Sequence, residues 1–257
     1  MADNQMHPLT GPVVDFSTVS KTYAKELGAQ AHIALAGLSF SMRAGETLGL
    51  IGANGAGKST AIKLIMDFIR PDAGSITILG RLPAEQAIRR RIGYLPETAN
   101  FPSNLTVLDM LRFTGSTCSL PQQEVHAASE KWLRRLGLWE ARKRPLRNYS
   151  KGMQQRANFA IALLNDPELL ILDEPMSGLD PIGRADILAL ITDLKRQGRS
   201  ILFCSHILED VDRLVDRVLV LHQGQKLFEG QPHSLAEQQD RPTFVDGYLR
   251  LVEQVQQ

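Results

Sequence analysis

The stretch "LGLIGANGAGKST", residues 48 to 60, constrains the fold more than any other part of the chain. An apolar run passes into glycines, a lysine and two hydroxyls, and Gly52, Gly57, Lys58 and Ser59 fit the pattern G-x-x-x-x-G-K-[ST] of a phosphate-binding loop, or P-loop. This pattern requires a strand before it and a helix after it, and the following "STAIKLIMDFI" has helical spacing. We therefore expect an α/β fold in which the loop joins a buried strand to a helix.

The residue types of this loop predict its chemistry. Its glycines allow backbone N–H groups to close around phosphate oxygens, Lys58 brings a point charge to the β- and γ-phosphates, and Ser59 is suited to bind Mg²⁺. The helix that starts here adds about half a positive charge at its N-terminus. A simple glycine-rich turn would not need a lysine followed by a hydroxyl.

Short β-rich segments recur along the chain, and they are residues 13–16, 47–51, 75–79, 92–95, 169–172, 200–203 and 217–221. Segments 47–51 and 169–172 are too uniformly apolar for a sheet with one exposed face, so they indicate a mostly parallel sheet flanked by helices. Between residues 104 and 164 helical spacing replaces the strand signals. An inserted helical subdomain is therefore predicted at about residues 98–165, and its Trp132 and Trp139 are read as packing residues.

Composition limits the class of protein. The net charge of +1 gives no electrostatic case for a nucleic-acid partner, and the longest run without polar residues or glycine has six residues, 159–164, against about 20 for a membrane span. The two cysteines form no CxxC pair, and the histidines show no zinc-type spacing. We expect a cytosolic protein with a disordered, untargeted lead-in at residues 1–12, an ATPase domain at 13–230 and a helical appendage at 231–257.

Two further motifs accompany the P-loop. "ELLILDEP" puts Asp173 and Glu174 directly after a buried strand, at the sheet edge where α/β proteins bind ligands; Asp173 can hold the Mg²⁺ shell and Glu174 can polarise water. In "NYSKGMQQRANFAIALL", Ser150 is a good N-cap and Gly152 permits close backbone approach, so this helix start is a second anion site.

The order GANGAGKST, YSKGMQQR, LLILDEP, SGLD and SH resembles the nucleotide-binding subunit of an ATP-binding cassette (ABC) transporter over residues 13–230. The resemblance implies a P-loop NTPase core with an N-terminal antiparallel β part and an inserted helical subdomain. It also implies MgATP as the bound species and catalytic roles for Lys58, Glu174 and His206. The implied nucleotide-binding residues are Tyr23, Gly52, Asn54, Gly55, Gly57, Lys58, Ser59, Thr60, Ser150, Gly152 and Asp180.

Within this resemblance, Tyr23 would stack on adenine, Ser59 and Asp173 would serve the metal, and His206 would contact the γ-phosphate and place Glu174. Residues 177–180 would cross to a second ATPase subunit, which would be an identical chain or a paralogue. The signature, Ser150 with Gly152, would close over the ATP held by the P-loop of that subunit. Hydrolysis would drive a separate integral membrane permease.

The sequence departs from the family pattern at two points. The usual LSGGQ signature reads YSKGM here, and Glu97 in "YLPE" stands where most members carry a glutamine that senses Mg²⁺. Glu97 is predicted to couple the core to the helical subdomain and is a candidate metal ligand. YLPE with YSKGMQQR resembles bacterial exporters whose ATPase and membrane subunits are separate chains.

Several alternatives remain open at this point. A soluble ABC-type ATPase that acts on ribosomes or DNA is the main one, although such proteins usually carry two cassettes, a coiled coil or zinc modules. A regulatory module without hydrolysis, a small-molecule kinase and a GTPase explain fewer of the motifs. The segment 102–112 is the expected contact with the membrane partner. The basic clusters 89–91 and 141–147 are interpreted as solvated surface, or as contacts to lipid headgroups or to an acidic segment of a partner.

Overall fold

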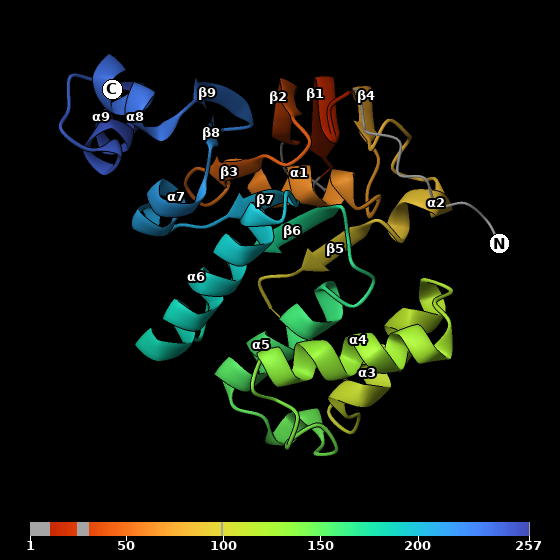
Figure 1. Ribbon diagram of the computed structural model, residues 1–257. Helices are drawn as coiled ribbons and strands as arrows, with labels where there is room; N and C mark the ends of the chain where they lie inside the picture. Colours follow the sequence, from red (N-terminus) through yellow and green to blue (C-terminus); the bar gives the residue numbers. More distant parts are fainter. Residues whose placement is uncertain (1–10, 25–30, 99, 257) are drawn as a thin grey trace.

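The computed structural model describes residues 11–24, 31–98 and 100–256, and it places their strands in two sheets (Figure 1). A three-stranded antiparallel sheet has the order β2-β1-β4, and a six-stranded sheet has the order β5-β6-β7-β3-β8-β9. The bounds are β1 Val14–Tyr23, β2 His32–Met42, β3 Thr47–Ile51, β4 Ala73–Ile78, β5 Ile92–Leu95, β6 Leu169–Asp173, β7 Ser200–Cys204, β8 Arg217–His222 and β9 Gln225–Gly230.

In the larger sheet β5, β6, β7, β3 and β8 pair in parallel, and β9 alone pairs antiparallel at one edge. Every residue of β3, β6 and β7 is buried. Alternate side chains enter two different cores, since Leu169 and Ile171 face one and Leu170 and Leu172 face the other. The two-sided cover inferred from the apolar segments 47–51 and 169–172 is confirmed.

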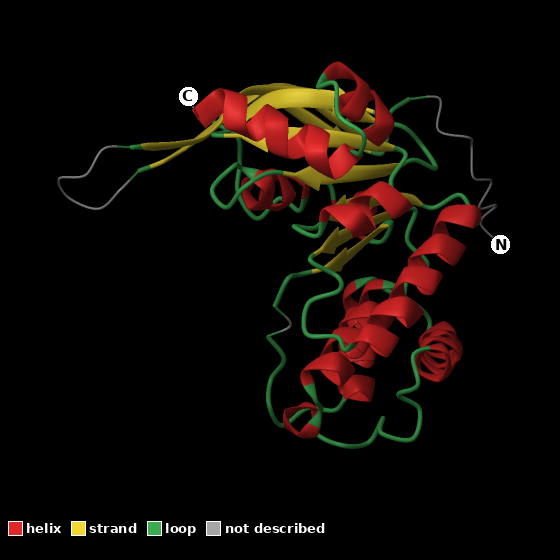
Figure 2. Ribbon diagram, turned by 90° about the vertical axis from the view of Figure 1, so that its left-hand side faces the viewer, coloured by secondary structure: helices red, strands yellow, loops and turns green. Residues whose placement is uncertain are grey.

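Helix α1 lies between the two sheets and packs against both of them (Figure 1). Helices α3, α4 and α5 gather in a helical part away from the antiparallel sheet, and α5 returns to contact β5 (Figure 2). The helix bounds are α1 Lys58–Ile65, α2 Gln86–Arg89, α3 Val107–Thr117, α4 Gln122–Arg135, α5 Lys151–Ala162, α6 Pro181–Arg196, α7 Leu208–Leu214, α8 Pro232–Gln238 and α9 Phe244–Gln256.

Some local predictions differ from the structure. The helix after the P-loop ends at Ile65 rather than continuing to residue 69, because Asp67 takes a left-handed backbone with φ 56°. Strands β2 and β9 were not anticipated. The C-terminal helices pack on the core through the buried Leu235 and Phe244.

Most of the predicted lead-in, residues 1–10, lies outside the described residues. Across the ranges that the structure covers, no helix has the length and apolarity needed to cross a membrane.

Candidate nucleotide-binding site

The P-loop connects the end of β3 to the start of α1, and its glycines are required by close backbone contacts. Gly52 has φ 152°, and a Cβ there would lie 2.3 Å from the Leu221 carbonyl oxygen. Gly57 has φ 109°, and its Cβ would lie 2.7 Å from the Ala34 carbonyl oxygen. Side chains at either position would therefore push the loop off its neighbouring strands.

Lys58 begins α1 and folds back over the loop. Its Nζ donates to the carbonyl oxygens of Gly52, at 2.6 Å, and Ala53, at 3.1 Å. These two bonds hold the ammonium beside the loop's backbone N–H groups and the helix N-terminus, so three sources of positive potential converge on one place. The geometry suits a polyphosphate.

A cavity of ≈ 150 Å³ lies over this loop and includes an aromatic side chain from β1. The Tyr23 hydroxyl is buried without a hydrogen-bond partner among the described residues. The structure thus brings Tyr23 to the P-loop, although the two are far apart in the sequence. The predicted binding residues that line the cavity are Tyr23, Asn54, Gly55, Gly57, Lys58, Ser59 and Thr60.

Asp173 ends β6 and is buried beside the P-loop lysine. The pKa of its carboxyl is raised, chiefly by burial and further by the negative charges of Glu97 and Glu174. A hydrogen bond from the Cys204 thiol and the positive charge of Lys58 lower this pKa in part. Besides burial, two neighbouring carboxylates and one lysine act on Asp173, so the negative side chains here outnumber the positive one. A divalent cation would relieve this imbalance.

Glu174 and His206 form a direct pair, with 2.8 Å between His206 Nδ1 and Glu174 Oε2. Glu174 has a left-handed backbone with φ 49°, which is uncommon for a residue other than glycine, and its N–H donates to the Cys204 carbonyl oxygen at 2.9 Å. The end of β7 therefore holds the Glu174 turn in place. The Glu174 side chain is 13% exposed, so it lies in a partly dehydrated position next to its imidazole partner.

The oxygen donors suit magnesium bound together with a nucleotide. The described residues contain no group of three His, Cys, Asp or Glu side chains that would hold a metal alone. Mg²⁺ commonly takes one or two protein oxygens and completes its shell with phosphates and water, which matches a Ser59 hydroxyl with an Asp173 carboxylate. Glu97 is exposed after β5, and its charge is felt at Asp173.

Ser150 caps α5 as predicted, since its side chain accepts from the Met153 N–H at 3.2 Å. Gly152 lies against residues 178–179, where a Cβ would be 3.6 Å from Leu179. Asp180, at the end of that segment, caps α6 by accepting from the Gly183 N–H at 2.9 Å. Neither Ser150 nor Gly152 lines the P-loop cavity, so this chain does not bring its own signature and P-loop together.

Two buried amides on the signature helix were missed by the sequence interpretation. Gln155 Nε2 donates to the Pro175 carbonyl oxygen at 2.9 Å, next to Glu174. Asn158 Nδ2 donates to the Pro96 carbonyl oxygen at 3.2 Å, directly before Glu97. Helix α5 thus contacts both loops that carry the candidate carboxylates Glu97 and Glu174. The available signal was a pair of amides in a helix whose other inward positions are apolar.

The segments considered for partner contact fall into two groups. Residues 102–106 and 141–147 lie side by side, since the Leu146 N–H donates to the Leu105 carbonyl oxygen at 2.8 Å. In the cluster 89–91, by contrast, Arg91 forms a two-bond ion pair with Glu168 and raises the stability of the β5–β6 edge. The cluster 89–91 is therefore partly structural.

The parallel sheet, the P-loop and the carboxylates at the end of β6 define a P-loop NTPase. The family model described as ABC transporter matches residues 35–177. The chain is 41% identical over 240 residues to an ABC transporter ATP-binding protein of Synechocystis sp., with 92% of this chain and 67% of that protein covered. It is 38% identical over 241 residues to Nod factor export ATP-binding protein I of Sinorhizobium fredii, with 93% and 68% covered. The chain thus spans about two thirds of the length of these relatives.

Solved structures agree with this result. A structure described as the ATP binding subunit of an ABC transporter has a TM-score of 0.84 at 31% identity and covers 93% of this chain and 99% of its own. A dimeric ATP-binding cassette in a post-hydrolysis state with ADP and Pi has a TM-score of 0.77 at 24% identity, covers 85% and 98%, and supports the fold. The chain belongs to the ABC transporter family, as an ATP-binding cassette ATPase. The family and the fold class predicted from the sequence are confirmed.

Proposed function

We propose that the chain binds and hydrolyses MgATP as the ATPase subunit of a membrane transporter. The observation that carries this proposal is the Glu174–His206 pair, held at 2.8 Å beside a complete P-loop. A nucleotide-binding module without hydrolysis would not need a strained glutamate with an imidazole partner.

In the proposed mechanism Lys58 and the P-loop N–H groups bind the β- and γ-phosphates, and Tyr23 stacks on the adenine. Ser59 and Asp173 would hold Mg²⁺, which neutralises phosphate charge when bound. Glu174 accepts a hydrogen bond from the attacking water and aligns it with the γ-phosphorus. His206 fixes the orientation of the Glu174 carboxylate and reaches the γ-phosphate.

The second half of each site comes from another cassette in this proposal. Ser150 and Gly152 do not line the P-loop cavity of their own chain, and in this proposal their helix N-terminus meets the γ-phosphate of ATP on a second copy or a paralogue. Residues 177–180 lie against the signature and would cross the same interface. ATP then joins the two subunits, and hydrolysis separates them.

Export by a separate integral membrane permease is the transport reaction that the relatives favour. One relative is named as a Nod factor export ATP-binding protein, and the YLPE and YSKGM motifs point to the same branch. The cassette would then bind the cytoplasmic face of the (bacterial inner) membrane through its permease. The near-neutral charge offers no support for a nucleic-acid partner.

Affinity purification tests this proposal. Tagged Glu174→Gln protein is recovered with MgATP from detergent-solubilised native membranes, and co-purifying chains are identified by mass spectrometry. We expect a membrane protein with several spans to co-purify in stoichiometric amount. Lys58→Ala is the matched control, and we expect the membrane protein to be lost from its preparation. Recovery of ribosomes or nucleic acid, without a membrane protein, would contradict the transporter role and favour a soluble ATPase.

A further inference from the structure

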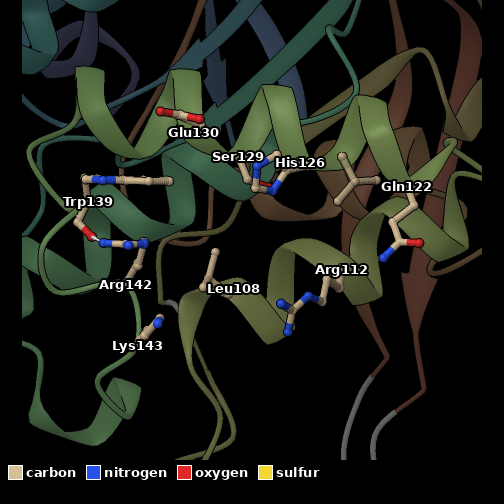
Figure 3. A pocket seen from close by; sticks show the side chains of 10 residues that line it. Leu108, Arg112, Gln122, His126, Ser129, Glu130, Trp139, Arg142 and Lys143 are labelled. Atoms are coloured by element: carbon tan, nitrogen blue, oxygen red, sulfur yellow. Dashed lines mark hydrogen bonds between the residues drawn. The ribbon is translucent and has the colours of Figure 1, made fainter.

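A second cavity, of ≈ 350 Å³, lies in the helical part of the chain (Figure 3). It is enclosed by α3, α4 and the segment 139–143, and it shares no lining residue with the cavity over the P-loop. Its volume falls in the range of about 300–1,000 Å³ that is typical of small-molecule sites. The chemistry at the P-loop does not use it, and its lining includes residues of segments 102–112 and 141–147, which were considered above for partner contact.

Trp139 forms one wall of this cavity, and two guanidinium groups lie against its ring. The Arg142 guanidinium lies 3.9 Å from the ring centre and the Arg134 guanidinium lies 4.5 Å from it. Arg142 also donates to the Trp139 carbonyl oxygen at 2.6 Å. Of the two arginines, only Arg142 lines the cavity. The contact with the ring holds the Arg142 guanidinium in place, and N–H groups that do not bond to Trp139 can still donate to a ligand.

The cavity carries an excess of positive charge. Arg112, Arg142 and Lys143 line it together with a single carboxylate, Glu130. Glu130 is already paired with Arg134 at 2.8 Å, outside the cavity lining. Within the described part of the chain Lys143 has no ion pair, and the contact of Arg112 with Asp109 is long at 3.4 Å. Figure 3 shows Arg112 and Arg142 on opposite sides of Leu108.

The inner wall supplies a buried hydroxyl and an apolar surface. Ser129 is only 5% exposed, lines the cavity from α4, and has no hydrogen-bond partner in the described ranges. Its neighbour His126 lies beside it in Figure 3, and Leu108 and Val125 contribute the apolar part of the lining. Because Ser129 lines the cavity, its hydroxyl can donate a hydrogen bond to a ligand oxygen.

We propose that this cavity binds a small organic anion that joins a carboxylate or a phosphate monoester to a flat apolar group. The anionic end lies between Arg112 and Arg142, where a charge-assisted, two-pronged contact is available. The apolar group packs on Leu108 and Trp139, and Ser129 donates a hydrogen bond to a ligand oxygen. The site shares no lining residue with the nucleotide site, and its test does not require a permease, although Leu108 and Arg112 belong to the segment expected to contact one.

Trp139 provides the signal for a test. The chain has two tryptophans, so the full-length Trp132→Phe variant has Trp139 as its single indole fluorophore. Benzoate and phenyl phosphate are titrated separately, with benzyl alcohol as the neutral analogue and sodium chloride at equal ionic strength. We expect a saturable fluorescence change with one or both anions and none with benzyl alcohol or sodium chloride. The anion that binds with the higher affinity shows whether the site prefers a carboxylate or a phosphate monoester. Calorimetry on the unaltered protein gives the same affinities without the substitution.

A pair of variants, each of which removes one positive charge, separates the cavity lining from the outer surface of α4. Arg142→Gln removes a lining guanidinium and is expected to weaken binding about tenfold or more, since a charge-assisted hydrogen bond is lost. Lys131→Gln removes one positive charge from the exposed surface of α4, outside the cavity lining, and should leave the affinity unchanged. Absence of saturable binding in both assays, or equal affinity in Arg142→Gln and the parent, would overturn the proposal.

Discussion

Ser150 is predicted to have two separable tasks, and aspartate at this position should keep one and abolish the other. In the free chain Ser150 makes a single N-cap bond, 3.2 Å long and exposed, so Ser150→Ala should cost only about 0.5–1 kcal/mol of unfolding free energy. Aspartate is as good an N-cap as serine and adds a favourable charge at the helix start, so Ser150→Asp should unfold within about 0.5 kcal/mol of the parent.

Against ATP on a second cassette the same aspartate is unfavourable. Two like charges 4 Å apart at an effective dielectric constant of 20 repel by on the order of 4 kcal/mol. We therefore expect ATP-driven association of Ser150→Asp, in a Glu174→Gln background, to be weaker by about a thousandfold.

Urea unfolding without nucleotide gives the stability, and sizing with MgATP gives the association. Gln123→Glu is the control, because it adds the same charge to the exposed first turn of α4, away from the nucleotide. Ser150→Asp that associates as tightly as this control would refute the assignment of Ser150 to the γ-phosphate. Ser150→Asp as unstable as Ser150→Ala would refute the capping argument.

Three further predictions concern the carboxylates and their supports. Glu174→Gln should bind MgATP, lose hydrolysis and form a long-lived dimer in sizing experiments; a monomer at every ATP concentration would exclude this. Glu97→Gln removes a negative charge that acts on Asp173, so the Mg²⁺ concentration for half-maximal ATPase should rise about two- to fivefold, the range for an exposed charge; an unchanged requirement would show that the charge has no role at the metal. Asn158→Ala leaves the Pro96 carbonyl without its amide donor and should lower the unfolding free energy by about 1–2 kcal/mol, measured by urea titration, and unchanged stability would show that the bond is dispensable.

The parts of the fold with uniform patterns were predictable. Strands β3, β6 and β7 are buried throughout and apolar except at one end, because both faces of the sheet are covered, and the P-loop fixes where a helix must begin. Strand β9 escaped prediction because it is an edge strand whose only buried side chain is Phe228. Strand β2 escaped because register shifts and the left-handed Gly37 break its alternation of buried and exposed residues.

In the candidate site, too, local motifs were predictable from the sequence and tertiary contacts were not. Motif spacing identified Lys58 and Glu174, since the P-loop and the strand-end carboxylates are local features of the chain. Contacts that depend on tertiary packing were not visible, and these include the left-handed turn at Glu174 and the amides of Gln155 and Asn158. A polar residue in a helix predicts burial and a partner only after the neighbouring loops are placed.

The most direct test of the composite site mixes two defective variants in the Glu174→Gln background. Lys58→Ala disables the P-loop and Ser150→Asp disables the signature, so neither should retain ATP alone. A mixed dimer contains one site with an intact P-loop from one chain and an intact signature from the other. The account predicts that the mixture recovers MgATP retention, measured by filter binding, that neither variant shows separately. Retention that stays at the level of the separate variants would contradict a site shared between two copies of this chain.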